Sequence, residues 1–334
     1  MNVAVIGAGS WGTALSQVLG GKGVGVSLWA RREEVAESIN EAHVNPSYLS
    51  DARLSENIVA TTSLEEALQD AEVVVMVSPS QNVREMCERM RGHVGPETPI
   101  VMCSKGVEEK TGLLLTQVVA DVLGGEDRIV VLSGPTHAEE VVFSQPSATV
   151  IAGTDPDTVT FIRDLFFTEK FRTYASDDPV GVELCGAFKN VIAIAVGISY
   201  GMGYGDNTAA LLITRGLAEM SRMVVACGGE AITCMGLGGA GDMVVTCMSR
   251  HSRNRRFGQD YVACGKTLED FKRDTHMVVE GAIACKTLEV LSNKHDVEIP
   301  LTDAVRQIIW SGGNLRELAR ALFMRPLTNE FYGI

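Results

Sequence analysis

The N-terminal stretch constrains the fold more than any other part of the chain. Residues 2–6, NVAVI, form an apolar run that leads directly into GAGSWG at 7–12, and a stretch of helical composition follows. A strand, a G-x-G-x-x-G turn and a helix in this order are typical of a doubly wound α/β sheet that binds a dinucleotide. Gly7 permits the tight turn, Gly9 lets the backbone approach a pyrophosphate, and Gly12 lets helix and strand pack closely.

The same glycine pattern occurs a second time, as GLGGAG at 236–241. No βαβ continuation follows this second match, whereas the first is followed by VGVSLWARR at 24–32, which predicts a second strand. Because a bare glycine pattern is weak evidence, the context decides. We expect a cofactor site at the first match and, at the second, a structural loop that positions the residues after it.

Two arginines occupy the position that decides between the two nicotinamide cofactors. NAD-binding proteins usually place an acidic residue at the end of the second strand, where it binds the ribose 2'-hydroxyl. This chain has Ala30, Arg31 and Arg32 there, with Glu33 and Glu34 following. Since arginine suits a 2'-phosphate and can stack on adenine, the pair favours NADPH, with NAD also accepted. The alternative is an ordinary solvated helix start.

Further apolar runs recur at regular intervals and predict the rest of the sheet. They alternate with helical stretches, and the strand signals fade near residue 180. We therefore expect a Rossmann-like doubly wound sheet in a domain over 1–179, followed by an all-helical domain over 180–334. The runs are EVVVMVSPS (72–80), PIVMCSKG (99–106), RIVVLSGPTHAEE (128–140), SATVIAG (147–153) and FRTYAS (171–176).

Three loops follow the predicted strands of this sheet, at 78–80, 104–106 and 134–137. Ligands of doubly wound sheets bind beyond the carboxyl ends of the strands, so these loops are candidates for ligand contact. Lys105 directly follows an apolar strand and is the charged side chain that we expect in the binding cleft. A plain surface lysine is the alternative.

The second half of the chain begins with a helix that should be buried. Residues 181–198, GVELCGAFKNVIAIAVGI, are apolar on nearly every face after position 190. Lys189 and Asn190 are therefore expensive to bury without a purpose. A buried lysine near another cation has a lowered pKa and can act as an acid or base near neutral pH. The alternative is a lysine at a helix end whose ammonium group reaches solvent.

Two helix starts follow. YGMGYGDN at 200–207 precedes a helical run, and Asp206 or Asn207 is its expected N-cap. The glycine loop at 236–241 leads to Asp242, with Thr246 one turn later on the same helical face. Asp242 is a candidate site residue, and a simple charge at a helix N-terminus is the alternative.

A cluster of arginines follows the Asp242 helix, in the stretch SRHSRNRRFG at 249–258. Its four arginines, with Ser252 and Asn254, offer forked donors and small polar groups suited to a compact dianion such as a phosphate ester. For some of the four, plain surface charge is the alternative.

The composition restricts the function further. The 334 residues carry a formal net charge of -13, which argues against a broad nucleic-acid surface. No apolar stretch approaches the length of a membrane span, and the N-terminus lacks the basic region of a signal peptide, so we expect a cytoplasmic protein without membrane insertion. The eight cysteines contain no C-x-x-C pair and the six histidines no H-x-x-x-H pair, so we expect no metal site.

Taken together, the motifs resemble those of the bacterial-type NAD(P)-dependent glycerol-3-phosphate dehydrogenases. The matching segments span nearly the whole chain in the family's order. They are GAGSWGTAL (7–15), SKG (104–106), GPTHAEEV (134–141), FKNVIAIAVGI (188–198), GDNTAALLITRGLAEM (205–220), GLGGAGDMVVTC (236–247), HSRNRRFG (251–258) and VVEG (278–281).

The resemblance implies reversible reduction of dihydroxyacetone phosphate to sn-glycerol 3-phosphate, the backbone precursor of phospholipids, by an enzyme that is commonly a homodimer. It also implies Lys189 as the proton-transfer residue, with Asp242 and Lys105 beside it as catalytic residues. Besides the three glycines of the turn, the implied cofactor residues are Ser10, Trp11, Arg31, Arg32, Lys105, Ala138, Arg253, Val278 and Glu280. The implied substrate residues are Lys105, Gly134, Thr136, Lys189, Asp242, Ser252, Arg253 and Asn254.

Two positions depart from the family pattern. Thr136 stands where serine is common, which is chemically conservative, and Tyr200 stands where aspartate is expected, which puts the local loop contacts in doubt. Two rival functions remain: another hydroxy-acid or sugar-acid dehydrogenase of the same architecture, and a dinucleotide sensor without catalysis. The arginine cluster argues against the first, and a sensor would need neither Lys189 nor Asp242.

Overall fold

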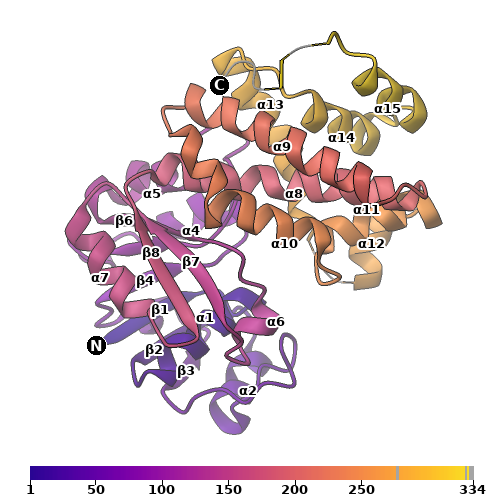
Figure 1. The fold of residues 1–334 in the computed structure, drawn as a ribbon. Helices are drawn as coiled ribbons and strands as arrows, with labels where there is room; N and C mark the ends of the chain where they lie inside the picture. Colours follow the sequence, from indigo (N-terminus) through magenta and orange to yellow (C-terminus); the bar gives the residue numbers. More distant parts are fainter. Residues whose placement is uncertain (276–277, 328, 331–334) are drawn as a thin grey trace. The chain divides into compact units, whose positions relative to one another are not determined.

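The computed structural model describes residues 1–275, 278–327 and 329–330, and the chain divides into two compact units (Figure 1). The first unit comprises Met1–Ser104 and Leu115–Pro179, and the second comprises Lys105–Leu114 and Val180–Ile334. The short segment Lys105–Leu114 therefore packs with the second unit, although strands of the first unit precede and follow it along the chain. This exchange departs from the predicted boundary, which placed all of 1–179 in the first domain.

The first unit is built on one eight-stranded sheet of order β3-β2-β1-β4-β5-β6-β7-β8. All neighbouring strands are parallel except β6 and β7, which are antiparallel. The chain reverses its direction of winding between β1 and β4, the place where doubly wound sheets bind ligands. The strands are β1 (Asn2–Ile6), β2 (Gly25–Trp29), β3 (Ile58–Thr61), β4 (Val73–Met76), β5 (Ile100–Met102), β6 (Ile129–Ser133), β7 (Ser147–Ala152) and β8 (Phe171–Ser176).

The central strands are apolar on both faces because helices cover both sides of the sheet. Val3, Val5 and every residue of β4 are buried, as expected for parallel strands inside an α/β layer structure. One strand, β3, was not predicted from the sequence; it is a four-residue edge strand in which Val59 is exposed. The helices of this unit are α1 (Ser10–Gly21), α2 (Glu33–Ala42), α3 (Leu64–Leu68), α4 (Val83–Met90), α5 (Leu115–Leu123), α6 (Ala138–Val141) and α7 (Pro156–Phe166).

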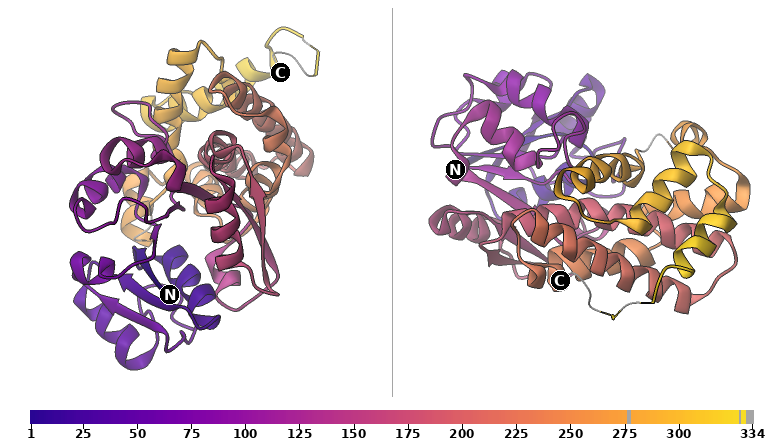
Figure 2. Two further views of the ribbon diagram at one scale, coloured as in Figure 1. Left: turned by 90° about the vertical axis from the view of Figure 1, so that its left-hand side faces the viewer. Right: turned by 90° about the horizontal axis from the view of Figure 1, so that it is seen from above.

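From Val180 onward the second unit is built from helices in its described residues, and Figure 2 shows these helices in red to yellow, packed against one another. The Rossmann-like sheet followed by a helical region confirms the predicted fold class. The α-helices are α8 (Pro179–Gly201), α9 (Asp206–Ala226), α10 (Asp242–Met248), α11 (Arg253–Cys264), α12 (Leu268–Thr275), α13 (Glu280–His295), α14 (Pro300–Ser311) and α15 (Leu315–Phe323).

Helix α8 is the central element of the second unit, buried without interruption from Gly181 to Ser199. Glycines allow its neighbours to approach closely: a Cβ at Gly197 would lie 2.0 Å from the backbone oxygen of Arg255 in α11, and one at Gly258 would lie 2.3 Å from that of Ile194. By length and composition α8 could span a membrane, contrary to the expectation that no segment comes near this limit. Its apolar window is wholly buried inside the structure, as in the core helix of a globular unit.

The sequence also predicted the N-cap of α9 and the form of the glycine loop at 236–241. The N-cap of α9 is Gly205, with no side-chain cap, so the expectation that Asp206 or Asn207 would cap this helix was wrong. Both residues lie inside the first turn instead, where the Asp206 charge suits the helix dipole. The glycine run 236–241 forms a short helical turn, Leu237–Gly241, that leads directly into α10 at Asp242.

Candidate active site

The glycine turn of the first unit has the shape of an anion cradle. Gly7 has φ +128°, and a Cβ there would lie 3.1 Å from the backbone oxygen of Val77. A Cβ at Gly12 would lie only 1.8 Å from the oxygen of Gly7, so the helix can meet the turn only with glycine at this position.

The space above the start of α1 is open. A Cβ at Gly9, the N-cap, would meet nothing within 4 Å, and no side chain caps the helix. Its first turn contains no acidic residue and includes Ser10 and the half-buried Trp11. A helix N-terminus with uncapped N–H groups and open space above it fits the pyrophosphate of a dinucleotide.

The arginine pair lies where the sequence predicted it, directly after β2, and both side chains are exposed. Arg32 Nη2 donates a hydrogen bond to Ser47 Oγ, and Arg32 Nε lies 3.5 Å from Glu34 Oε1. The start of α2 therefore presents two guanidinium groups at the surface. One of them is held by a loop that the sequence analysis did not single out.

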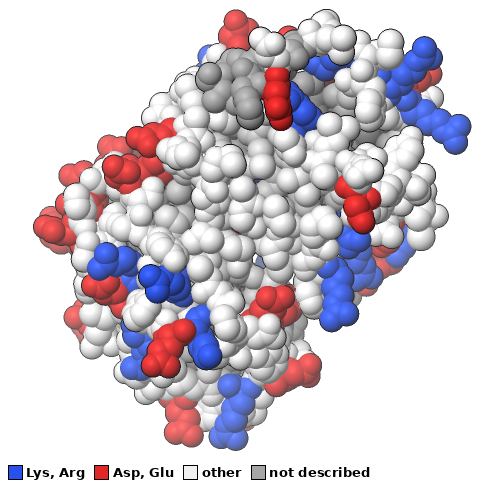
Figure 3. Space-filling view, in the orientation of Figure 1, with Lys and Arg blue, Asp and Glu red and all other residues white. Residues whose placement is uncertain are grey.

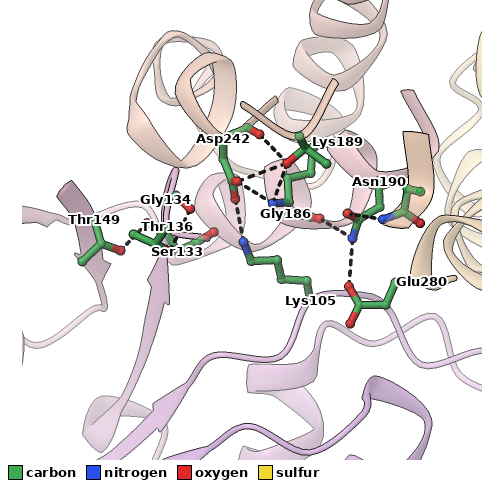
Figure 4. A network of polar contacts seen from close by, with 12 residues as sticks. Lys105, Ser133, Gly134, Thr136, Thr149, Gly186, Lys189, Asn190, Asp242 and Glu280 are labelled. Carbon is green, nitrogen blue, oxygen red and sulfur yellow. Dashed lines mark hydrogen bonds and ion pairs between the residues drawn. The ribbon is translucent and has the colours of Figure 1, made fainter. Parts of the chain in front are cut away.

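Hydrogen bonds at the carboxyl edge of the sheet join the loops after β4 and β5 and, separately, tie the end of β6 to β7. Ser104 Oγ donates to Ser78 O. Figure 4 shows the second of these contacts, in which Thr149 Oγ1 donates to Ser133 O at 2.8 Å. Gly134 lies so close to Thr149 that a Cβ would be 2.8 Å from its Cα, while Thr136 Oγ1 donates to Gly134 O at 3.2 Å. Among the predicted site residues of this edge, Ala138 is buried and opens α6.

Three charged side chains of the second unit meet in one buried centre (Figure 4). Lys189 Nζ donates to Asp242 Oδ1 and, at 3.0 Å, to Thr246 Oγ1, while Lys105 Nζ donates to Asp242 Oδ2 at 2.6 Å. Asp242 is 1% exposed and Lys189 is 7% exposed. A surface role is therefore excluded for Lys189, and Asp242 is more than a helix-end charge. Thr246 completes the centre by donating to Asp242 O at 2.6 Å.

The two lysines of this centre differ in pKa. Burial, together with the positive charge of Lys105, lowers the pKa of Lys189 to about 8 despite its ion pair with Asp242. Burial also acts to lower the pKa of Lys105, but its bonds to Asp242 outweigh this and leave the pKa above its ordinary value. Burial acts to raise the pKa of Asp242, and the two lysines outweigh it, so the carboxylate stays ionised. Lys189 is thus the cation prepared to release a proton near neutral pH.

A second buried network adjoins this centre through α8. Asn190 Nδ2 donates to Glu280 Oε2 at 3.2 Å, and Asn254 Nδ2 donates to Asn190 Oδ1 at 2.9 Å. Asn254 Oδ1 in turn accepts from the backbone N–H of Gly281 at 2.9 Å. The amide of Asn254 therefore joins α8, α11 and α13, a structural role that the sequence analysis did not foresee. The sequence marked Asn190, next to Lys189, only as a residue that is costly to bury, and predicted no role for it.

The arginines of the cluster have different surroundings. Ser252 is buried and caps α11 by accepting from Arg255 N at 3.2 Å. The Arg255 guanidinium lies 5.0 Å from the ring centre of Tyr200, and Arg256 forms a 3.8 Å ion pair with Asp260. Arg253, the first residue of α11, is exposed and adds a positive charge to a positive helix end. Of the other predicted cofactor residues, Val278 is exposed at 39% and Glu280 begins α13.

A glycine turn at the switch point of a doubly wound sheet, together with a buried lysine of lowered pKa, defines a nicotinamide-dependent oxidoreductase as the class of protein. Among the described residues, no group of three or more His, Cys, Asp or Glu side chains could hold a metal ion.

Comparison with known sequences identifies the family. The N-terminal region of NAD-dependent glycerol-3-phosphate dehydrogenase matches residues 2–159, and the C-terminal region matches residues 178–320. The chain belongs to this family, as the motifs predicted. A glycerol-3-phosphate dehydrogenase [NAD(P)+] of Corynebacterium urealyticum is 44% identical over 332 residues, 99% of this chain and 100% of the relative. The enzyme of the same name from Chlorobium limicola is 42% identical over 334 residues, 99% of this chain and 100% of the relative.

A solved structure agrees with this assignment. The crystal structure of glycerol-3-phosphate dehydrogenase from Coxiella burnetii has a TM-score of 0.92 with this chain and 36% sequence identity. The match covers 97% of this chain and 99% of the solved one, so the similarity extends over both units.

Proposed function

We propose that this chain is an NAD(P)-dependent glycerol-3-phosphate dehydrogenase that reversibly reduces dihydroxyacetone phosphate to sn-glycerol 3-phosphate, supplying the phospholipid backbone. The observation that carries the proposal is the buried centre of Lys105, Lys189 and Asp242. A reductase of a ketone must supply a proton to the carbonyl oxygen as negative charge develops there, and a buried lysine with a pKa of about 8 is suited to this task.

The chain's own residues then take distinct roles. When bound, NADH or NADPH supplies the hydride for the ketone carbon. Lys189 gives its proton to the carbonyl oxygen, and in the reverse direction the neutral amine accepts the proton from the alcohol. Asp242 orients the Lys189 ammonium group and keeps its charge balanced. Lys105 adds a second cation that favours charge on the oxygen, and its raised pKa keeps it protonated.

The cofactor is held mainly by the first unit. The first-turn N–H groups of α1 bind the pyrophosphate, with Gly7, Gly9 and Gly12 shaping the turn. The open space at Gly9 supports this role, and Arg31 and Arg32 favour NADPH by binding its 2'-phosphate. The remaining proposed cofactor residues are Ser10, Trp11, Lys105, Ala138, Arg253, Val278 and Glu280.

The substrate phosphate is bound by Arg253 and the hydroxyl of Ser252. Arg253 supports this assignment because no described residue neutralises it by an ion pair, in contrast to Arg256. The amide of Asn254 is already bonded to Asn190 and Gly281. Asn254 therefore contributes to phosphate binding indirectly, by holding α11 in place. The remaining proposed substrate residues are Lys105, Gly134, Thr136, Lys189 and Asp242.

One spectrophotometric assay tests the function. Purified protein with NADH or NADPH should consume the reduced cofactor when dihydroxyacetone phosphate is added, and the absorbance of the nicotinamide band should fall. Consumption with a hydroxy-acid precursor or sugar acid instead of the phosphorylated triose would favour the rival dehydrogenase. Binding of NADPH without consumption by any of these substrates would favour the sensor.

We also propose that the chain works in the cytoplasm, as a homodimer. In the orientation of Figure 1, the surface over α9 and α10 is largely uncharged (Figure 3). Ile232 and Met235, in the turn Ala231–Met235, are 70% and 67% exposed, and Val244 of α10 is 47% exposed. A two-fold interface joins the same surface patch of both subunits, so an uncharged patch avoids bringing like charges together in a chain with a net charge of -13. Light scattering that gives a monomer mass at micromolar concentration would contradict the dimer.

A further inference from the structure

One buried side chain connects the glycine turn to the loop that holds Arg32. Asn45 is fully buried, and its amide uses every hydrogen-bonding position that it has. Nδ2 donates to Ala8 O at 3.0 Å and to Thr13 Oγ1 at 2.8 Å, so both amide hydrogens bind the turn and the first residues of α1. Oδ1 accepts from the backbone N–H groups of Ser47 and Tyr48, each at 3.2 Å.

The two acceptor bonds give the loop its shape. Asn45 is followed by Pro46, and its side chain closes a tight turn over the next two residues, as asparagine does before proline. This turn places Ser47 at the surface, where its hydroxyl accepts a hydrogen bond from Arg32. The chain of contacts therefore runs from Ala8, between the first two glycines of the pattern, through Asn45 and Ser47 to Arg32.

We propose that Asn45 is a positioning residue for the cofactor, and that Ser47 is a specificity-determining residue for its 2'-phosphate. Asn45 holds the pyrophosphate turn and the arginine pair in one fixed arrangement, so that the two negatively charged parts of NADPH are bound together. Ser47 fixes the Arg32 guanidinium beside the end of β2. This inference rests on the proposed function, because it assumes that the turn and the arginines bind NAD(P)H.

The position of Asn45 makes the assignment testable. Its side chain is fully buried and its amide is saturated by protein groups, so it acts on the cofactor only through Ala8, Thr13 and the loop. Thr13 is also fully buried, and Thr13→Val removes one bond to Asn45 without changing volume or charge appreciably. Ser47→Ala removes the contact with Arg32 and leaves the backbone N–H of Ser47 bonded to Asn45. The three variants Asn45→Ala, Thr13→Val and Ser47→Ala thus interrupt the connection at different points.

A matched control lies in the same unit. Asn40 also fixes backbone through its amide: Nδ2 donates to Ala60 O at 2.8 Å and Oδ1 accepts from Ala60 N at 2.7 Å. It anchors the edge strand β3, away from the glycine turn and Ser47, because both of its amide bonds go to Ala60. Asn40→Ala should therefore lower stability without changing cofactor affinity.

The experiment is a fluorescence titration of the full chain and each variant with NADH and with NADPH, at a temperature where circular dichroism shows the protein folded. Since one hydrogen bond is worth about 0.5–1.5 kcal/mol, Thr13→Val should raise the Kd of both cofactors about 2- to 10-fold. Asn45→Ala should raise both about 10- to 50-fold and NADPH by the larger factor. Ser47→Ala should raise the Kd of NADPH alone, about 3- to 10-fold.

Four outcomes are informative. The pattern above, with Asn40→Ala at wild-type affinity, supports the proposal. Unchanged Kd values in Asn45→Ala, with only a lower melting temperature, would make Asn45 a purely structural residue and overturn it. If Asn45→Ala does not fold, unchanged affinity in Thr13→Val overturns it instead. Failure of the wild-type chain to bind either cofactor would defeat the proposed function itself, a result that no variant can imitate.

Discussion

The glycine turn of the first unit and the lysine–aspartate centre of the second are built for charged groups in opposite ways. The turn uses backbone N–H groups and the absence of side chains, with a Cβ excluded at Gly12 and open space at Gly9. The centre uses three ionised side chains, of which Asp242 is 1% exposed. A backbone site is fixed by the fold and carries no titratable group, so it suits binding, whereas buried ionised groups have shifted pKa values and suit proton transfer.

The largest effect is expected at Lys189, where the proposed proton-transfer role can be separated from cofactor binding. We expect Lys189→Met to lower turnover by roughly a hundredfold or more, the scale of a positioned acid or base, while the affinity for NADPH stays nearly unchanged. Steady-state kinetics together with an NADPH titration separates the two effects. Turnover near the wild-type value would remove Lys189 from the chemistry.

A substitution in the glycine turn should instead weaken cofactor binding. Gly12→Ala places a Cβ 1.8 Å from Gly7 O, so the helix must shift away from the turn. We expect the Kd of both NADH and NADPH to rise by roughly 30-fold or more, since this corresponds to about 2 kcal/mol of overpacking and lost alignment. Gly21→Ala is the matched control, in the same helix, because its Cβ meets nothing within 4 Å. Equal effects of the two substitutions would show that close packing at Gly12 does not matter for binding.

The arginine cluster of the second unit combines an exposed cation with a helix N-terminus. A charge-assisted hydrogen bond contributes about 1.5–3 kcal/mol, so Arg253→Met should cost roughly ten- to two-hundredfold in kcat/KM for dihydroxyacetone phosphate. Unphosphorylated dihydroxyacetone, a poor substrate, should lose far less, and Arg256→Met, which removes an arginine paired with Asp260, should lose little. NADPH affinity must be measured alongside, with cofactor saturating in the assay. Equal losses with both substrates would exclude a phosphate site.

The lysine–aspartate centre of the second unit should impose a pH dependence near neutrality. Lys189 with a pKa of about 8 is protonated below that pH and neutral above it. Ketone reduction needs the protonated form, so its kcat should fall as pH rises through about 8, up to tenfold per pH unit. Alcohol oxidation needs the neutral amine, so its kcat should rise over the same range. The same direction of change in both reactions would contradict acid–base catalysis by Lys189.

The sequence predicted the two kinds of site unequally. The glycine turn was predictable in full, because strand, turn and helix are contiguous and each glycine answers a local steric need. The lysines could be singled out as costly to bury, but the contact between Lys105 and Asp242 joins residues 137 positions apart, and no local pattern encodes it.

Other features had no strong local signal. The strand β3 was missed because an edge strand of four residues has little apolar periodicity. Asn45 was missed for another reason: Asn-Pro predicts a turn, and the burial of its amide against Ala8 depends on the folded sheet.

The smallest expected effect concerns two charged side chains of the first unit, Arg31 and Arg32. Arg31 and Arg32 are exposed, so solvent screens their attraction for a 2'-phosphate, and Arg32 is partly neutralised by Glu34. Replacing both with glutamine should raise the KM for NADPH roughly tenfold and leave the KM for NADH nearly unchanged, because NADH has no phosphate at this position. The ratio of the two KM values, measured at low and at physiological salt, is the decisive quantity. A charge effect should be larger at low salt. Equal losses with both cofactors would mean that the arginines do not bind the 2'-phosphate, and the first unit would then rely on backbone groups alone.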